Sequence, residues 1–164
     1  MVIAIDGPAG VGKSSIAKMV ANELGIYYLN SGNFYRGVTW KVICTGTDPE
    51  NREEVEKVAA SAQFDVVDGV FMFDGEEVED KLHTPQVDLL ASKISVNPAV
   101  RSIVNDRIHQ LTAKVSIIAE GRDMTTVVFP DAQHKFFFDA APEIRAQRRF
   151  DQNPSAMPYE KVLA

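Results

Sequence analysis

Gly7-Pro8-Ala9-Gly10-Val11-Gly12-Lys13-Ser14 is the stretch that decides the fold. It fits the pattern G-x-x-x-x-G-K-[ST], and it lies between the apolar run of residues 2–5 and a helical pattern that begins near Lys13. A short apolar run of this kind is typical of a strand buried on both faces. Average glycine usage predicts a chance match at a rate on the order of 1% or less. We therefore expect a phosphate-binding loop, or P-loop, that joins a strand to a helix.

The residue types of this loop suit a bound polyphosphate. Glycines let backbone N–H groups turn inward around an anion, and the helix N-terminus adds the positive end of its dipole. Lys13 is expected to bridge the β- and γ-phosphates, and the Ser14 hydroxyl to hold a metal ion. We therefore predict ATP and Mg²⁺ as cofactors, with Ser14 as the metal ligand. The residues predicted to hold ATP are Gly7, Pro8, Ala9, Gly10, Val11, Gly12, Lys13, Ser14 and Ser15.

The composition predicts one acidic domain. A chain of 164 residues with 45% hydrophobic residues can bury one core but is too short for two full domains, so we expect a single domain over residues 1–164. The 23 acidic and 17 basic residues give a net charge of −6, which argues against nucleic-acid binding through bulk electrostatics. No segment resembles a signal peptide or a membrane span, so we expect no membrane partner.

The single cysteine indicates in which redox compartment the protein works. Cys44 has no second cysteine with which to form an internal disulfide, and no Cys/His cluster has metal-ligand spacing. We expect Cys44 to be a small core residue, and we expect the protein to work in the reducing cytoplasm.

Strand and helix patterns alternate along the rest of the chain. We predict strands at 26–29, 115–119 and 135–138 and helices at 34–42, 50–62, 85–94, 98–111 and 143–150, with the start of another at 159–164. The run Phe136-Phe137-Phe138 is expected in the sheet core. Three further strands, at 64–67, 70–73 and 76–78, are divided by Asp68-Gly69 and Asp74-Gly75, which are hairpin turn signals. These patterns predict a three-layer α/β/α P-loop fold. Its sheet is mainly parallel, and a small antiparallel insert lies on the acceptor side at about 63–79.

The loop by itself does not separate a kinase from a GTPase or a motor ATPase, because each needs the same phosphate cradle. GTPases read guanine through an Asn-Lys-x-Asp segment after a strand, and this sequence has none. The short chain and the helix after Gly32 favour a small-molecule or nucleotide kinase.

Three further segments narrow the acceptor. The first is Leu29-Asn30-Ser31-Gly32-Asn33-Phe34-Tyr35-Arg36. The second is Ala91-Ser92-Lys93 followed by Asn97-Pro98-Ala99-Val100-Arg101. The third is Glu120-Gly121-Arg122-Asp123-Met124, which continues into Thr126-Val127-Val128-Phe129-Pro130-Asp131-Ala132. With the loop, these segments resemble the bacterial cytidylate kinases over nearly the whole chain. The third pattern is not shared with adenylate, guanylate or shikimate kinases.

The resemblance implies a monomeric nucleoside monophosphate kinase that transfers the γ-phosphoryl group of ATP to CMP or dCMP. It implies that Arg36 and Arg122 grip the acceptor phosphate, a role that suits a planar bidentate donor, and that both act with Lys13 in catalysis. It implies that the cytosine ring meets Ser31, Ser92, Arg101 and Asp123. An aspartate accepts a hydrogen bond from the cytosine amino group but meets the uracil carbonyl unfavourably. The acceptor oxygen is already ionised near neutral pH, so we expect no general base.

Several residues keep a second interpretation. Ser31 could cap the helix that follows it, Arg36 and Arg101 could be solvated, and Arg122 and Asp123 could pair with each other. Two acidic residues near the loop are equally open. Glu120 could hold Mg²⁺ through water or cap a turn, and Asp6 could tie down the loop or orient the Mg²⁺ shell.

The chain departs from the family pattern at three places. Asn30 replaces an aspartate, and Thr125 replaces a glycine whose backbone would be freer. The family also continues past residue 164 with an arginine-rich lid, so we expect weak binding and little turnover if this chain is complete. Arg148 or Arg149 could still approach the ATP phosphates. The alternatives are another small-molecule P-loop kinase and a catalytically weak ATP-binding module.

Overall fold

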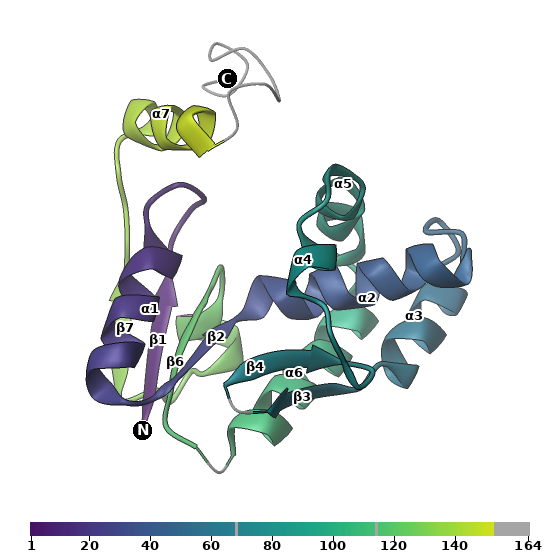
Figure 1. The fold of residues 1–164 in the computed structure, drawn as a ribbon, viewed down its shortest axis with the longest axis horizontal. Helices are drawn as coiled ribbons and strands as arrows, with labels where there is room; N and C mark the ends of the chain where they lie inside the picture. The colour runs from purple at the N-terminus through teal and green to yellow at the C-terminus, as the bar shows by residue number, and fades with distance from the viewer. Residues whose placement is uncertain (68, 114, 153–164) are drawn as a thin grey trace. The chain divides into compact units, whose positions relative to one another are not determined.

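The computed structural model describes residues 1–67, 69–113 and 115–152, and the predicted helix at 159–164 lies outside them. The chain divides into two compact units (Figure 1). Unit 1 is Met1–Leu29 with Ser116–Ala164, and unit 2 is Asn30–Val115. Each unit is described by itself, and the single domain expected from the sequence stays a prediction.

Unit 1 is built on a parallel sheet. Its strands are β1 (Val2–Asp6), β2 (Tyr27–Asn30), β6 (Ile117–Gly121) and β7 (His134–Phe137), in the order β2-β6-β1-β7. β1 pairs in parallel with both β6 and β7, so the carboxyl ends of these three strands lie together. Asp6, the last residue of β1, is the register partner of Gly121 on one side and of Phe137 on the other. The predicted α/β fold with a mainly parallel sheet is confirmed.

Two helices and one short turn accompany the sheet in the described part of unit 1. They are α1 (Lys13–Leu24), α7 (Pro142–Gln152) and a π-helical turn, η1 (Met124–Val128), which the sequence patterns did not predict. Helix α1 packs on β1 and β6, where its alanines meet the apolar side chains of the strands. Gly25 ends α1 in a left-handed conformation with φ 63°, as its position after Leu24 predicts. None of the helices in the described ranges is long and apolar enough to cross a membrane.

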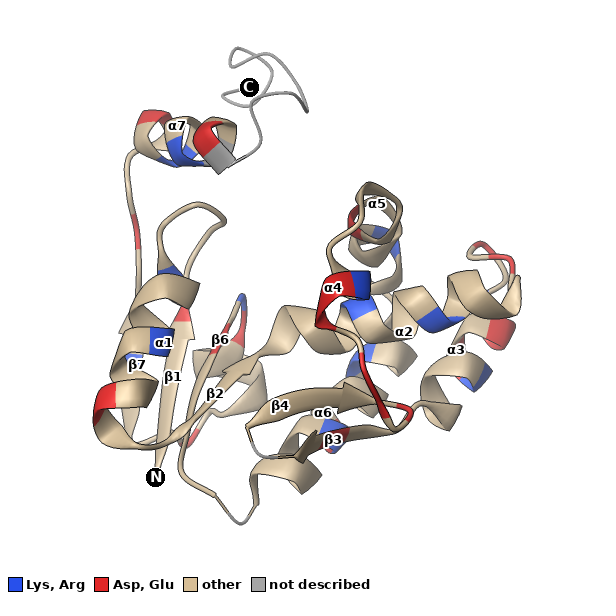
Figure 2. Cartoon of the chain, in the orientation of Figure 1, with Lys and Arg blue, Asp and Glu red and all other residues tan. Residues whose placement is uncertain are grey.

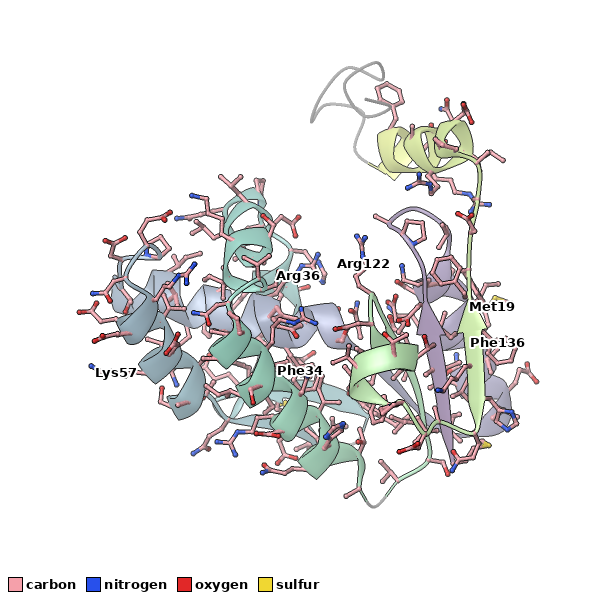
Figure 3. The ribbon with its side chains drawn as sticks, turned by 180° about the vertical axis from the view of Figure 1, so that it is seen from behind. Met19, Phe34, Arg36, Lys57, Arg122 and Phe136 are labelled. Atoms are coloured by element: carbon pink, nitrogen blue, oxygen red, sulfur yellow. The ribbon has the colours of Figure 1, made fainter. Side chains whose placement is uncertain are left out.

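The prediction that all three phenylalanines of β7 and its end lie in the sheet core is wrong. Phe136, labelled in Figure 3, is 51% exposed and Phe137 is 71% exposed. Phe138 is partly buried against the core. β7 is one of the two edge strands of the four-stranded sheet, and its apolar side chains border an open groove with Ile16 and Leu24 of α1. An apolar run does not show whether its strand lies inside a sheet or at its edge, and for this reason the sequence did not predict the exposure of Phe136 and Phe137.

Unit 2 combines helices with the predicted antiparallel insert. Its helices are α2 (Ser31–Thr45), α3 (Arg52–Ser61), α4 (Glu79–Leu82), α5 (Pro85–Ile94) and α6 (Pro98–Thr112). The strands β3 (Phe64–Val67), β4 (Val70–Phe73) and β5 (Glu76–Glu77) form one antiparallel sheet. Asp74 and Gly75 both have positive φ between β4 and β5, as a tight hairpin turn requires. The antiparallel part of the predicted fold is therefore confirmed.

Aromatic packing holds the antiparallel sheet to α2. The ring of Phe34 lies 4.8 Å from that of Phe64 and 5.1 Å from that of Phe71, between ring centroids. Gly37 is needed here, because a Cβ at this position would lie 2.6 Å from the Phe73 ring. The expectation that Cys44 is a core residue is wrong, since Cys44 is exposed near the end of α2.

Candidate active site

The loop between β1 and α1 has the backbone that its glycines permit. Gly7, Gly10 and Gly12 have φ of 149°, 79° and 94°, values that other residues rarely adopt. Gly12 is the N-cap of α1, so the loop ends at the positive end of that helix. A Cβ on Gly7 would lie 2.2 Å from the carbonyl oxygen of Phe138, so the loop passes directly against the end of β7.

Lys13 follows this loop as the first residue of α1, and it is only 8% exposed. Its ammonium donates hydrogen bonds to the carbonyl oxygens of Gly7 and Pro8, each at 2.8 Å. Burial lowers the pKa of Lys13 below its ordinary 10.5. Glu120 and Asp6 raise this pKa again, while the positive charge of Arg122 lowers it. These charges act on Lys13 from within unit 1, so the structure brings the predicted residues Lys13 and Arg122 together.

The lowered pKa of Lys13 predicts how phosphate binding depends on pH. We expect the affinity for ATP to fall as pH rises toward 10.5, beginning at a lower pH than an ordinary lysine would give. The neutral amine attracts phosphate less, so ATP binding should take up a proton in this range. Titration calorimetry in buffers of different ionisation enthalpy measures that uptake. Lys13→Arg, which keeps its charge, should remove it, and an equal uptake in the variant would contradict the assignment.

Ser14 contacts a buried carboxylate. Its hydroxyl donates to Glu120 Oε1 at 2.6 Å, and the same oxygen accepts the hydroxyl of Tyr28 at 2.8 Å. Glu120, near the end of β6, is 5% exposed. Its two open interpretations, holding Mg²⁺ through water and capping a turn, both stay predictions, and the contact that the structure adds is the one with the Ser14 hydroxyl. Tyr28 was missed from the sequence, because only the neighbouring positions of β2 and β6 in the sheet bring it to Glu120.

Among the residues that the structure describes, those bonded to the Asp6 carboxylate lie in the turn after β6 and not in the loop. This carboxylate, in a residue 3% exposed, accepts the backbone N–H of Met124 at 2.7 Å and that of Thr125 at 2.8 Å. The Thr125 hydroxyl donates to the same carboxylate. Asp6 therefore ties down the turn that follows β6. Thr125 gains a bond that glycine could not make, and it does not adopt the positive φ at which a side chain would be strained.

Arg122 and Asp123 lie between β6 and η1, directly after the strand that carries Glu120. Figure 3 shows Arg122 projecting from the end of this strand. Among the described residues, none forms an ion pair with Arg122. Its guanidinium is thus available to an anion near the ammonium of Lys13.

Helix α7 also lies against the loop, and Figure 2 shows its run of basic residues. Arg148 donates to the carbonyl oxygens of Val11 at 3.1 Å and Gly10 at 3.4 Å. A Cβ on Gly10 would lie 2.9 Å from the Arg145 carbonyl oxygen, so this approach also depends on glycine. Arg148 thus reaches the loop itself. The side chain of Arg149 is outside the described part of the structure.

Four of the residues predicted to bind the acceptor belong to unit 2. Asn30, not Ser31, caps α2, because its side chain accepts the N–H of Gly32 at 2.9 Å. Ser31 is the first residue of the helix and is 5% exposed. Arg36 is one turn further on, and its Nε lies 3.1 Å from Asp88 Oδ1. A Cβ on Gly32 would lie 2.6 Å from Arg36 Nη1, so the glycine makes room for this guanidinium.

Arg101 and Ser92 complete this set on the neighbouring helices. Arg101 donates to the Ser95 carbonyl oxygen at 3.2 Å, and its guanidinium lies 5.8 Å from the ring centroid of Tyr35 on α2. The exposed Ser92 donates to the Leu89 carbonyl oxygen within α5. Arg36 and Arg101 are thus both associated with α2, whereas Lys13, Arg122 and Asp123 belong to unit 1.

A phosphate-binding loop on a parallel sheet, with its serine bonded to a buried carboxylate and its lysine within the field of that carboxylate and of an arginine, defines the class of P-loop phosphotransferases. The family model described as cytidylate kinase matches residues 3–164, and the chain belongs to this family.

Curated relatives support the same family. The chain is similar to the cytidylate kinase of Oleidesulfovibrio alaskensis, with 40% identity over 95% of this chain and 73% of that protein. It is 41% identical to the cytidylate kinase of Thermus thermophilus, over 99% of this chain and 78% of the other. A solved structure titled "Crystal structure of TT1252 from Thermus thermophilus" overlaps 99% of this chain and 76% of its own. The identity there is 20% and the TM-score 0.49, too loose a likeness to bear on function.

Proposed function

We propose that this P-loop phosphotransferase transfers the γ-phosphoryl group of ATP to CMP or dCMP and releases ADP with CDP or dCDP. The family and the names of its relatives support this acceptor. The observation that carries the proposal is the pair of neighbouring cations at the strand ends, Lys13 and Arg122, whose charges act on each other. In-line transfer between two phosphate groups needs positive charge on both, and these two residues are the ones we propose to supply it.

On the donor side, the loop residues 7–15 hold the phosphates of ATP. Backbone N–H groups and the N-terminus of α1 face the anion, and Lys13 bridges its β- and γ-phosphates. Mg²⁺ fits beside Ser14, because a hydroxyl next to the Glu120 carboxylate offers the oxygen ligands that this ion prefers. The ion would neutralise charge that develops on the phosphate oxygens. Glu120, which also accepts the hydroxyl of Tyr28, fixes the Ser14 hydroxyl in place.

Within the ranges described, no three His, Cys, Asp or Glu side chains form a group that could hold a metal ion. Mg²⁺ is typically bound by one or two protein groups together with substrate phosphates, and Ser14 with Glu120 is a set of this size. We therefore propose that the ion arrives with the nucleotide.

On the acceptor side, Arg122 and Arg36 hold the phosphate of CMP. Arg36 engages Asp88 through Nε, which leaves the Nη1 and Nη2 end of its fork for a phosphate. Ser31, Ser92, Arg101 and Asp123 are proposed to meet the cytosine. No base is required, because the attacking phosphate oxygen is ionised at neutral pH and transfer depends on positioning and charge.

Asp123 is the proposed reader of the cytosine amino group, and Asp123→Ala tests it. We expect the ratio of kcat/KM for CMP to that for UMP to fall at least about tenfold, since one good contact to a base edge is worth ~1–3 kcal/mol. Steady-state assays with both nucleotides measure the ratio. Asp131→Ala, at an exposed aspartate of unit 1, is the control and should leave it unchanged. An unchanged ratio in Asp123→Ala would show that another group reads the base.

The overall proposal is tested by coupled ADP release with Mg-ATP and a panel of CMP, dCMP, UMP, AMP and shikimate, together with calorimetric binding of each compound. We expect turnover with CMP and dCMP above the others. Activity with a different acceptor would favour another small-molecule kinase. ATP binding with no turnover on any acceptor would favour a catalytically weak ATP-binding module.

We further propose that the protein acts as a monomer in the cytoplasm. The exposed thiol of Cys44 suits a reducing compartment, and one cysteine offers no internal disulfide. Sedimentation at assay concentrations tests the monomer, and a dimer there would overturn it.

A further inference from the structure

The carboxylate of Asp6 is a buried charge held by a single neighbouring segment. It is 3% exposed, and all three of the hydrogen bonds described above come from Met124 and Thr125. Oδ1 accepts one bond and Oδ2 accepts two. A buried carboxylate with this many donors is firmly placed, because losing one donor would leave a desolvated oxygen unpaired.

The backbone of Asp6 is paired with the residue that lies just before Arg122 and Asp123. Asp6 is the register partner of Gly121 in the parallel pairing of β1 with β6. Arg122 and Asp123 therefore form a two-residue connection, with Gly121 before it paired to Asp6 and Met124 after it bonded to Asp6. We call Asp6 with Thr125 the Asp6–Thr125 latch. Both ends of the connection are fixed to one residue of the central strand.

The π-helical turn adds to this restraint. Phe129 N donates to the Met124 carbonyl oxygen at 2.8 Å, and Val128 N donates to that of Asp123 at 3.1 Å. π-turns are uncommon and occur often at functional sites. The turn begins at Met124, and the N–H groups of Met124 and Thr125 both donate to the Asp6 carboxylate. The carboxylate therefore stabilises the first N–H groups of η1 as a capping residue would.

We propose that Asp6 and Thr125 are positioning residues that set the placement of Arg122, and with it the affinity for the acceptor phosphate. This inference rests on the proposed function, in which Arg122 grips that phosphate. Neither residue of the latch touches the substrate. The hydroxyl of Thr125 supplies one of the three bonds of the latch.

Thr125→Val removes the hydroxyl and keeps the size of the side chain and both backbone bonds. We expect KM for the acceptor to rise about three- to tenfold, the net effect of losing one ordinary hydrogen bond, with KM for ATP within about twofold of its starting value. Thr125→Ser keeps a hydroxyl and should restore the acceptor KM. A purely structural role would move both KM values or the melting temperature alone, and that result would overturn the proposal.

A double-mutant cycle shows whether the latch acts through Arg122. Arg122→Lys keeps a charge but loses the planar fork, so placement of the segment matters less. We expect Thr125→Val to change the acceptor KM by less than about twofold in this background. Full additivity of the two effects would overturn the proposal.

Amide hydrogen exchange separates this inference from the proposed function. Thr125→Val should speed exchange at Met124 and Thr125 and leave the α1 amides unchanged. If the wild type phosphorylates an acceptor other than CMP, the function in its stated form falls, and the cycle is run on that acceptor. If it phosphorylates none, the exchange result decides, and unchanged exchange at Met124 and Thr125 overturns the latch.

Discussion

Lys13→Met is expected to lower kcat at least about 10²–10³-fold, the cost of removing one preorganised charge from a developing transition state. The methionine keeps the length and most of the volume of the side chain and loses the ammonium that lies between the loop and the strand ends. That ammonium donates to Gly7 and Pro8, so the change also loosens the loop. Single-turnover kinetics with saturating Mg-ATP measures the loss without the contribution of binding.

Lys57→Met is the matched control for this substitution. Lys57 is an exposed lysine on α3, in unit 2 (Figure 3), and its replacement removes the same charge. We expect kcat to stay within about twofold, since the charge of a solvent-exposed lysine is screened by salt. A loss of similar size in both variants would mean that net charge, not the position of Lys13, governs the rate.

The P-loop and its surroundings could be predicted because their signals are local. Glycine spacing requires the positive φ values found at Gly7, Gly10 and Gly12, and Gly25 marks the end of α1. The antiparallel insert was predicted for the same reason, because its turn residues lie next to the strands that they connect. In these segments the neighbours along the chain determine the structure.

Contacts between distant residues could not be read in the same way. Asp6 and Thr125 are 119 positions apart and Tyr28 and Glu120 are 92 apart, and each pair meets only because of the strand order β2-β6-β1-β7. The prediction for Phe136 and Phe137 was wrong for a related reason, since the apolar pattern of a central strand also occurs in this edge strand. A glutamate after a buried strand was noticed, but its partner on β2 was not.

The backbone of Gly7 predicts the second large effect, which falls on stability and ATP binding together. A Cβ here would approach the carbonyl oxygen of Phe138 to 2.2 Å and its carbonyl carbon to 3.1 Å. This neighbour is backbone, and the Phe138 N–H donates to the Asp6 carbonyl oxygen at 2.8 Å, so it cannot withdraw without disturbing the end of the sheet. The positive φ of Gly7 adds strain for any side chain.

We expect Gly7→Ala to cost about 3–5 kcal/mol of the free energy of unfolding, more than most single substitutions, and to weaken ATP binding. Gly25→Ala separates the effect of backbone strain from that of a steric clash. Gly25 also has a positive φ, 63°, but no atom lies within 4 Å of its added Cβ. This control should cost about 1–2 kcal/mol, the price of a left-handed residue, with ATP affinity unchanged. Chemical denaturation and calorimetry measure both variants. If Gly7→Ala lost no more stability than Gly25→Ala, the close approach of the loop to β7 would not be a property of the folded protein in solution.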